Sequence, residues 1–331
     1  MALGLPMGLC WDACAVTSPP IIDPIQIPML LWFDFTDTAG MFQEIDSFTT
    51  AADANNDKIG RVLNKAYTTQ TNLGIAATSR IGVFGRALNL SKRPTLKTGG
   101  ANGYNYAQFT ASDLTSIVTK QDSDFGVHSG TTLRSGGING HSWSYLMVSQ
   151  ADDNDSDGIE EKMFGLKFAK LGTTSSRQFT VYREDDDQVR LETTTLAAVN
   201  TRSLPASASD GLTKNTSLEV RMSSAQPEVG AQGAPLWRHA RGLNNAQSVS
   251  LDQIFIDEVS AGAAITSSLQ ESGFVGGVSV GGDAMNDANA RHFDGKIYEF
   301  ILFEQSLSLS DMNSLAYYYA QKYGIDIEGE N

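Results

Sequence analysis

Apolar side chains recur along the chain in short alternating or continuous runs of strand length, separated by Gly, Asp, Asn and Ser. The pattern predicts strands at residues 30–35, 104–109, 143–149, 163–169, 179–182, 218–222, 254–256, 274–280 and 297–303. No helical pattern intervenes regularly between these runs and no fixed-period repeat is visible, which disfavours parallel βαβ units and solenoids. We therefore expect an all-β fold with antiparallel sheets.

One helix is predicted near the end of the sequence. Its apolar residues repeat at steps of three and four: Leu309, Met312, Leu315, Ala316, Tyr319 and Tyr323. Ser308 and Asp311 form a variant of a capping box before the first turn. Gly324 follows as a stop, because glycine accepts the left-handed conformation in which helices often end.

Two stretches of the sequence resemble the laminin G-like, concanavalin A-like lectin jelly rolls found in bacterial proteins and in phage virion structural proteins. LLWFDFTD (30–37), KRPTLKT (92–98) and NYAQF (105–109) resemble that family's opening strand, arginine-proline link and next core strand. The segment HFDGKIYEFILFEQSLSLSDMNSLAYYYAQKYGI (292–325) is similar to its closing strand, turn and terminal helix. The resemblance implies one antiparallel jelly-roll sandwich over residues 29–331, which binds carbohydrate or protein.

The closing strand of that sandwich should have two mainly apolar faces, because its side chains alternate between them. The alternation sets Tyr298, Phe300 and Leu302 against Ile297, Glu299, Ile301 and Phe303. The terminal helix could cover one of these faces. Glu299 is the polar exception, and we expect its face to reach solvent near the start of the strand.

Residues 1–28 form an apolar segment that contains five prolines, which prevent a long helix. Because the first basic residue is Lys58, the positively charged start of a secretory signal is missing, and we expect synthesis in the host cytoplasm without export. An extended arm cannot bury its own apolar side chains, so it must lie on another surface. We expect an assembly anchor formed by Leu3, Leu5, Leu9 and Trp11, the alternative being a strap over the same sandwich.

The net charge of −14 disfavours nucleic-acid binding, and no apolar run approaches the roughly 20 residues of a membrane span. Together with the resemblance and the arm, this favours a non-enzymatic virion protein, either a capsid decoration or a tail-fibre or baseplate appendage. Its expected partners are other virion proteins, further copies of itself and a cell-surface glycan.

Ligand-binding candidates come from an aromatic residue and a loop. Trp237, in PLWRHARG, offers an indole on which a sugar could pack. The Gly-, Ser- and Thr-rich stretch 126–141 contains His128 and His141 and should form a long exposed loop, where sandwiches often carry binding residues. The alternative for Trp237 is burial of its indole in the core. The alternative for the loop is that it only connects two strands.

Asp153, Asp155 and Asp157 have the spacing of a calcium loop, where alternating carboxylates converge on the ion. The twelfth position is Phe164 instead of a bidentate Glu, so a solvated hairpin tip is the simpler interpretation. No cofactor is required; calcium is the candidate, and a free calcium-dependent lectin is an alternative function.

The segment Glu44 to Asp46 is similar to the start of the carboxylate cluster in jelly-roll glucanases. The third carboxylate is missing, because Phe48 and Thr49 occupy the positions where it could fall. We therefore expect no enzymatic activity, and a glycan-processing hydrolase remains the alternative.

Overall fold

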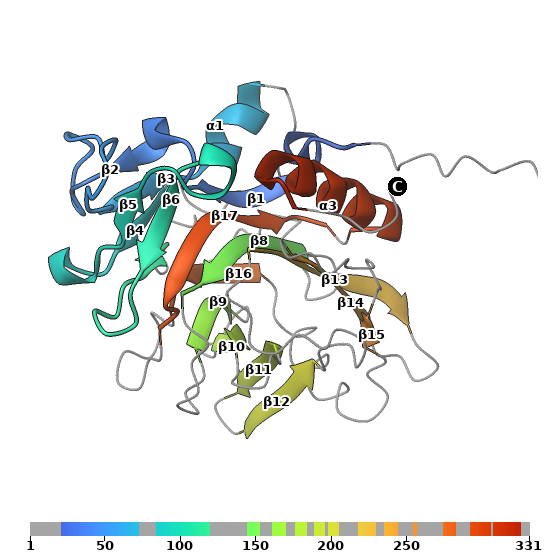
Figure 1. Ribbon diagram of the computed structural model, residues 1–331. Helices are drawn as coiled ribbons and strands as arrows, with labels where there is room; N and C mark the ends of the chain where they lie inside the picture. Colours follow the sequence, from blue (N-terminus) through green and yellow to red (C-terminus); the bar gives the residue numbers. More distant parts are fainter. Residues whose placement is uncertain are drawn as a thin grey trace, which may run out of the picture.

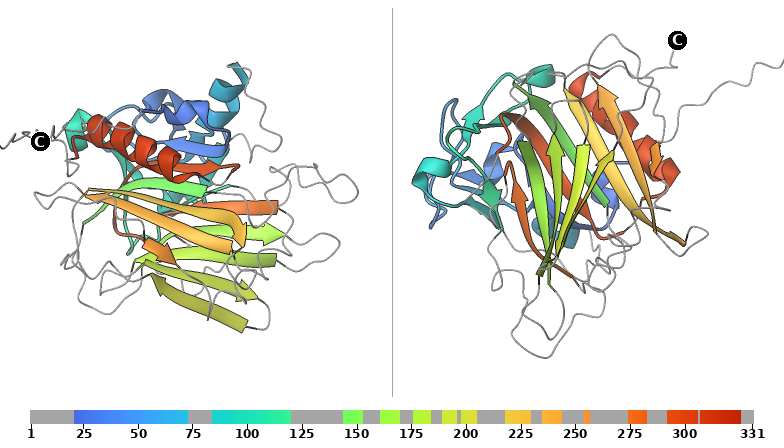
Figure 2. Two further views of the ribbon diagram at one scale, coloured as in Figure 1. Left: turned by 90° about the vertical axis from the view of Figure 1, so that its right-hand side faces the viewer. Right: turned by 90° about the horizontal axis from the view of Figure 1, so that it is seen from below.

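The computed structural model describes residues 21–72, 84–119, 144–152, 161–169, 176–183, 189–195, 198–204, 218–229, 235–243, 254–256, 274–282, 292–305 and 307–325. These residues form two stacked sheets, and helix α3 lies outside the upper sheet (Figure 1). Figure 2 (left) shows the order of the layers from the side: helices, eight-stranded sheet, nine-stranded sheet.

The eight-stranded sheet has the order β15, β14, β13, β8, β17, β6, β5, and β1 pairs with β17 beside this path. Its strands are β1 (Met29–Asp34), β5 (Thr95–Lys97), β6 (Tyr106–Phe109), β8 (Ser144–Ala151), β13 (Glu219–Val229), β14 (Pro235–Leu243), β15 (Ile254–Ile256) and β17 (Gly295–Phe303).

The nine-stranded sheet has the order β12, β11, β10, β9, β16, β7, β4, β3, β2. Its strands are β2 (Met41–Phe42), β3 (Arg61–Leu63), β4 (Phe84–Ala87), β7 (Ile117–Val118), β9 (Glu161–Ala169), β10 (Ser176–Arg183), β11 (Val189–Thr195), β12 (Ala198–Leu204) and β16 (Phe274–Val280).

Neighbouring strands in both sheets run antiparallel throughout the part of the chain that the structure describes. The predicted all-β antiparallel sandwich with a C-terminal helix is therefore confirmed. Each of the nine predicted apolar runs coincides with a strand or overlaps one.

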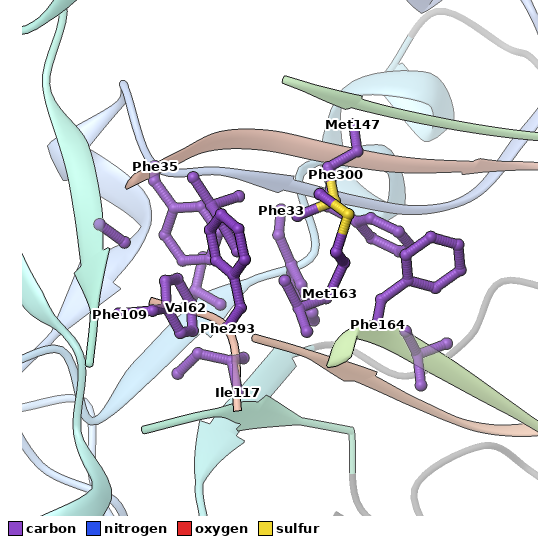
Figure 3. Close-up of a cluster of buried hydrophobic side chains, with 14 of the residues drawn as sticks. Phe33, Phe35, Val62, Phe109, Ile117, Met147, Met163, Phe164, Phe293 and Phe300 are labelled. Atoms are coloured by element: carbon purple, nitrogen blue, oxygen red, sulfur yellow. The ribbon is translucent and has the colours of Figure 1, made fainter. Parts of the chain in front are cut away.

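The main core lies between the two sheets and is rich in phenylalanine (Figure 3). Phe35, directly after β1, meets Phe109 of β6 edge-on, with ring centroids 6.0 Å apart. Phe300 of β17 lies 4.9 Å from Phe164 of β9, so this contact bridges the two sheets. Burying aromatic rings of this size supplies much of the hydrophobic free energy that holds a sandwich together.

A second core lies between the outer face of the eight-stranded sheet and the helical layer. That layer consists of α3 (Leu309–Tyr323), α1 (Lys65–Asn72) and the 3-10 turn η1 (Pro24–Gln26). The remaining 3-10 turns are η2 (Thr38–Gly40), η3 (Leu90–Lys92) and η4 (Ala101–Gly103). No helix in the described residues is long and apolar enough to span a membrane.

Both ends of α3 agree with the sequence prediction. The Ser308 hydroxyl accepts a hydrogen bond from the backbone N–H of Asp311, and the Asp311 carboxylate accepts one from the N–H of Ser308. Gly324 ends the helix with φ +68°, the left-handed conformation that glycine tolerates best. Helix α1 was not predicted, because its sequence KAYTTQTN carries no apolar stripe.

The segment that leads into β1 packs against the body of the sandwich. Ile27 is buried in the second core, and Ile22 and Ile25 pack against it while Ile21 is half exposed. The end of the predicted arm is thus a strap on its own domain. The predicted anchor residues Leu3, Leu5, Leu9 and Trp11 lie outside the described residues.

A β-bulge in the closing strand changes the face of the residues before Glu299, and the cover of helix α3 overturns the predicted exposure of Glu299 itself. In the pairing of β17 with β8, Ile297 is opposite Ser149 and Glu299 is opposite Val148, which leaves Tyr298 as the extra residue. Tyr298 and Glu299 therefore both lie on the side of the second core. Glu299 is fully buried (0% exposed), so its predicted exposure was wrong, although the same face reaches solvent nearer the start of the strand, at the partly exposed Lys296.

Candidate functional site

A row of polar side chains crosses the outer face of the eight-stranded sheet beyond the end of α3. The register places Thr95 of β5 opposite Gln108 of β6, Gln108 opposite Lys296 of β17, and Lys296 opposite Gln150 of β8. Lys58 extends the row at its outer end through a bridge with Thr95. We call Lys58, Thr95, Gln108, Lys296 and Gln150 the cross-strand row.

The side chains of the row point away from the main core. Ala107, Phe109 and Ile297, which alternate with row residues along β6 and β17, are all buried in that core. Lys58 is exposed and the other four row residues are partly exposed. The row is therefore open to a ligand across several strands.

Hydrogen bonds link the members of the row to their neighbours. Lys58 Nζ donates to Thr95 Oγ1 at 2.8 Å, and Lys296 Nζ donates to Gln150 Oε1 at 3.1 Å. The Gln108 amide donates to the carboxylate of the exposed Asp152. The row thus presents ammonium, amide, hydroxyl and carboxylate groups, which suit the hydroxyl groups of a sugar.

Tyrosines border the row on the side of α3. Tyr106 is partly exposed, and its ring centroid lies 5.4 Å from that of the buried Tyr298 and 5.5 Å from Lys296 Nζ. Burial, and then the nearby Asp152 carboxylate, raise the pKa of Tyr106, so its hydroxyl stays protonated at neutral pH. Tyr106 can pack on an apolar sugar face while its hydroxyl still donates a hydrogen bond.

The tyrosine border continues into the protein interior. Tyr298 contacts Tyr323 at 5.2 Å between ring centroids, and Tyr104 contacts Tyr323 at 5.4 Å. The hydroxyl of Tyr298 also accepts a hydrogen bond of 3.0 Å from the backbone N–H of Ala101. These contacts fix Tyr106 against a rigid support, so a ligand would meet a largely pre-organised surface.

Glu299 lies beneath these tyrosines and binds Tyr323 directly. Its carboxylate accepts hydrogen bonds from Trp32 Nε1 (2.9 Å), the Tyr319 hydroxyl (3.2 Å), Lys322 Nζ (2.6 Å) and the Tyr323 hydroxyl. Burial, and then the nearby Asp34 carboxylate, raise the pKa of Glu299. Four donors satisfy the acid away from water, which is how a buried carboxylate is tolerated.

A second pair of charges lies beside Glu299. Asp34 of β1 accepts a hydrogen bond of 2.6 Å from Lys65 Nζ, at the start of α1. Burial alone would raise the pKa of Asp34, but the charges of Lys65 and Lys322 outweigh it and lower the pKa. These groups fasten both helices to the sheet and are not available to a ligand.

The sequence-based binding and metal candidates are not brought together in the described residues. Trp237 lies on β14 opposite Ala225 of β13, but its side chain is outside the described part of the structure. His128, His141, Asp153, Asp155 and Asp157 also lie outside it. Among the described residues, no group of three His, Cys, Asp or Glu side chains could hold a metal ion.

Glu44 and Asp46, considered above as the start of a carboxylate cluster, have other partners. Glu44 accepts a hydrogen bond of 3.0 Å from the backbone N–H of Thr50, and Asp46 forms an ion pair of 3.5 Å with Arg86. The side chain between them, Ile45, packs on the main core. The two carboxylates therefore stabilise a loop instead of converging on a shared substrate position.

The exposed aromatic residue Phe48 belongs to the same loop, between β2 and β3. The Arg61 guanidinium lies over the rings of Phe48 and Phe84, 4.5 and 4.4 Å from their centroids. Arg61 Nε also donates to the carbonyl of Ile45 at 2.7 Å. This buried guanidinium fixes the loop, so Phe48 is explained by packing even though it is 43% exposed.

The sequence reasoning missed the cross-strand row, although part of its signal was present. Tyr106 and Gln108 alternate with apolar residues, as does Lys296 between Gly295 and Ile297, which indicates an outward face. The missing information was strand order, which brings together residues 95, 108, 150 and 296 from four separate parts of the chain.

Comparisons with known proteins identify no family. No family model and no curated protein match the chain. Among solved structures, it is similar to the CBM40 domain of the Ruminococcus gnavus IT-sialidase bound to α2,3-sialyllactose (TM-score 0.36, 13% identity, 53% of this chain and 82% of that one).

Two further solved structures share a partial likeness. One is a leech intramolecular trans-sialidase (TM-score 0.36, 16% identity). The likeness covers 59% of this chain and 25% of the trans-sialidase chain. The other is the enzymatically active domain of tailspike protein 2 from bacteriophage CBA120 (TM-score 0.40, 9% identity), with 32% of that chain and 74% of this one covered. We transfer no residue role from these proteins.

Proposed function

We propose that this chain is a non-enzymatic, lectin-like structural component of a phage particle. Its sandwich binds a cell-surface glycan through Tyr106 and the cross-strand row, and its N-terminal arm joins it to other virion proteins. The observation that carries the proposal is the row itself, where polar groups and a supported tyrosine form one accessible surface. Sugar recognition needs this combination of an aromatic platform and hydrogen-bonding groups.

The structural roles of Glu44, Asp46 and Glu299 favour glycan binding over glycan hydrolysis. A glycosidase needs two carboxyl groups facing one substrate bond. Glu44 and Asp46 are used in a loop, and Glu299 is buried beneath α3. The virion part of the proposal rests on the sequence resemblance and the apolar arm.

Glycan binding is tested on an array of bacterial surface glycans with the full chain, in buffers with calcium and with a chelator. We expect binding that survives chelation and no release of reducing sugar from any bound glycan. Calcium-dependent binding would instead favour the free lectin, and release of sugar would favour the hydrolase. No binding to any glycan would overturn the glycan-binding part of the proposal.

The site is tested with Tyr106→Ala, which removes the aromatic platform. We expect at least a five-fold loss of affinity for the array ligand, on the scale of one aromatic contact. Tyr67→Ala is the matched control, because Tyr67 is a 46% exposed tyrosine on α1. Equal affinities for both variants would place the binding site elsewhere.

The arm is tested by deleting residues 1–20 and leaving the packed residues Ile22, Ile25 and Ile27 in place. The truncated protein should keep the thermal stability and glycan affinity of the full chain but fail to join particles during assembly. Incorporation at the full-length level would exclude the arm as the anchor.

A further inference from the structure

The lysines on and beside the cross-strand row bear on the charge of the glycan that the row would bind. Three lysines lie on this face: Lys58 and Lys296 in the row, and Lys97, which is opposite Tyr106 in the pairing of β5 with β6. Lys97 Nζ donates a hydrogen bond of 2.6 Å to the side-chain oxygen of Asn56. The hydrogen-bond partners of all three ammonium groups are thus neutral: Asn56, Thr95 and Gln150.

The lysines of the second core show that this chain pairs its buried ammonium groups with acids. Lys65 is bonded to Asp34 and Lys322 to Glu299, both at 2.6 Å. On the row, the exposed carboxylate of Asp152 accepts a hydrogen bond from Gln108. Among the described side chains of the row and those hydrogen-bonded to the three lysines or to Gln108, three carry a positive charge and one, Asp152, carries a negative charge, in a protein whose net charge is −14.

We infer that the ligand of the cross-strand row is a carboxylate-bearing polysaccharide. This inference rests on the proposed glycan binding and specifies the charge of the glycan. Lys58 and Lys296 are three strand positions apart, or about 14 Å at the usual strand spacing. A linear polymer lying across the strands would bring acidic groups to both lysines and place a sugar ring on Tyr106.

The carbohydrate class follows from the combination of groups around the lysines. Gln108 and Gln150 offer amide groups for sugar hydroxyls, and Tyr106 offers an aromatic face. A nucleic acid would gain from the same lysines, and the net charge of −14 opposes both kinds of polyanion, so the choice between them depends on the amide and aromatic groups. The lysines select an anionic ligand, and the remaining groups favour a sugar.

The test measures binding of the full chain to polygalacturonate, alginate and hyaluronan, each compared with its carboxyl-reduced, neutral form. We expect at least ten-fold tighter binding to one acidic polymer than to its reduced form, as removal of a charged partner usually costs about this much. The affinity should also fall as salt rises from 50 to 500 mM, because exposed charges are screened.

The variant Lys296→Gln should lower the affinity for the acidic polymer about ten-fold and that for the reduced polymer by a smaller factor, because the reduced polymer has no carboxylate to lose its partner. Arg86→Gln is the matched control: it removes one positive charge from the nine-stranded sheet. Equal weakening by both variants would show that net charge, and not this row, drives binding.

Three results would overturn the inference. The first is equal affinity for the acidic and reduced polymers, and the second is binding of none of the three acids. The third is binding of duplex DNA as tightly as the best acid, with the same dependence on Lys296. If the acidic and reduced polymers bound equally and Tyr106→Ala weakened both, the proposed function would stand and the inference would fail. No binding to any glycan, acidic or neutral, would remove both.

Discussion

The indole Nε1 of Trp32 donates a hydrogen bond of 2.9 Å to Oε2 of Glu299, and this contact joins the first strand of the sandwich to the last. The same carboxylate holds Lys322 and two tyrosines of α3. One buried acid therefore connects β1, β17 and the terminal helix. Because Tyr323 also supports the tyrosine border of the proposed site, the stability of this network bears on function.

Glu299→Gln should destabilise the protein by about 3 kcal/mol, since it leaves the largely buried Lys322 without its anion. Urea unfolding followed by tryptophan fluorescence measures the loss. The double variant Glu299→Gln/Lys322→Met should recover part of it, because no unpaired charge remains. A single variant within 1 kcal/mol of the wild type would show that the ion pair contributes little.

Alkaline pH should weaken the same network. Burial, and then the charge of Glu299, raise the pKa values of Tyr319 and Tyr323 well above 10.0. The pKa of Lys322 is also raised, because the charges of Glu299 and Asp34 outweigh the opposing effect of burial. Such groups hold their protons longer in the folded protein, so their contribution is complete below the unfolded pKa and is lost as pH rises through the folded one.

The free energy of unfolding should therefore fall as pH increases beyond about 10, by up to roughly 1.4 kcal/mol per pH unit for each proton concerned. Urea midpoints between pH 8 and pH 11 measure this slope. The variant Tyr319→Phe/Tyr323→Phe should flatten it, whereas Tyr67→Phe, which changes an exposed ring, should not. An unchanged slope in the double variant would contradict the assignment.

The parts of the fold that the sequence predicts are those in which local pattern and tertiary environment agree. Helix α3 carries its own stripe, cap and stop, and long strands such as β16 and β17 have apolar runs that only a sandwich core would cover. Strands β3 and β7, of three and two residues, are too short to show a period. They form because longer neighbours offer hydrogen-bonding partners.

The closing strand shows why side-chain environment was harder to predict than strand position. A strand pattern of period two assumes no inserted residue, and the bulge at Tyr298 changes the face of every residue before it. The bulge arises from pairing with β8, some 150 positions earlier in the chain, and Glu299 is buried by contacts with Trp32 of β1 and with α3, so the sequence of the strand itself signals neither. The cross-strand row depends on distant pairings in the same way.

Gly281 should tolerate no side chain, because two separate costs combine there. Its φ of +80° disfavours any L-residue, and an added Cβ would lie 2.1 Å from the buried ring of Phe109. Gly99 has a similar φ of +73° but open space around its Cα. Gly281→Ala should cost about 3 kcal/mol and Gly99→Ala about 1 kcal/mol, as measured by urea unfolding.

The difference between these two glycine variants isolates the crowding at Phe109, because the conformational cost is shared. Equal losses would mean that the ring of Phe109 moves aside at little cost. In that case the packing of Phe109 against Phe35, beside Gly281, would be looser than the close approach of the two rings indicates.

Asn64 protects the free edge of β1, and its replacement should expose that edge. The side-chain amide donates to the carbonyl of Leu30 and accepts from the N–H of Trp32, both at 2.9 Å, as a neighbouring strand would. Asn64→Asp keeps the shape but replaces the donor with an oxygen facing the Leu30 carbonyl. We expect a loss of about 3 kcal/mol, because a buried acceptor loses its partner and a charge is buried.

Exposed strand edges also promote association between chains, so the Asn64→Asp protein should form larger species on mild heating. Light scattering during a thermal ramp tests this, alongside urea unfolding. Asn102→Asp is the matched control: its amide donates to the Lys322 carbonyl on the surface, so its loss should stay below about 1 kcal/mol. If both variants lost the same stability and neither aggregated, the amide of Asn64 would be an ordinary hydrogen-bonding group. The edge of β1 would then be protected by the packing of α1 instead.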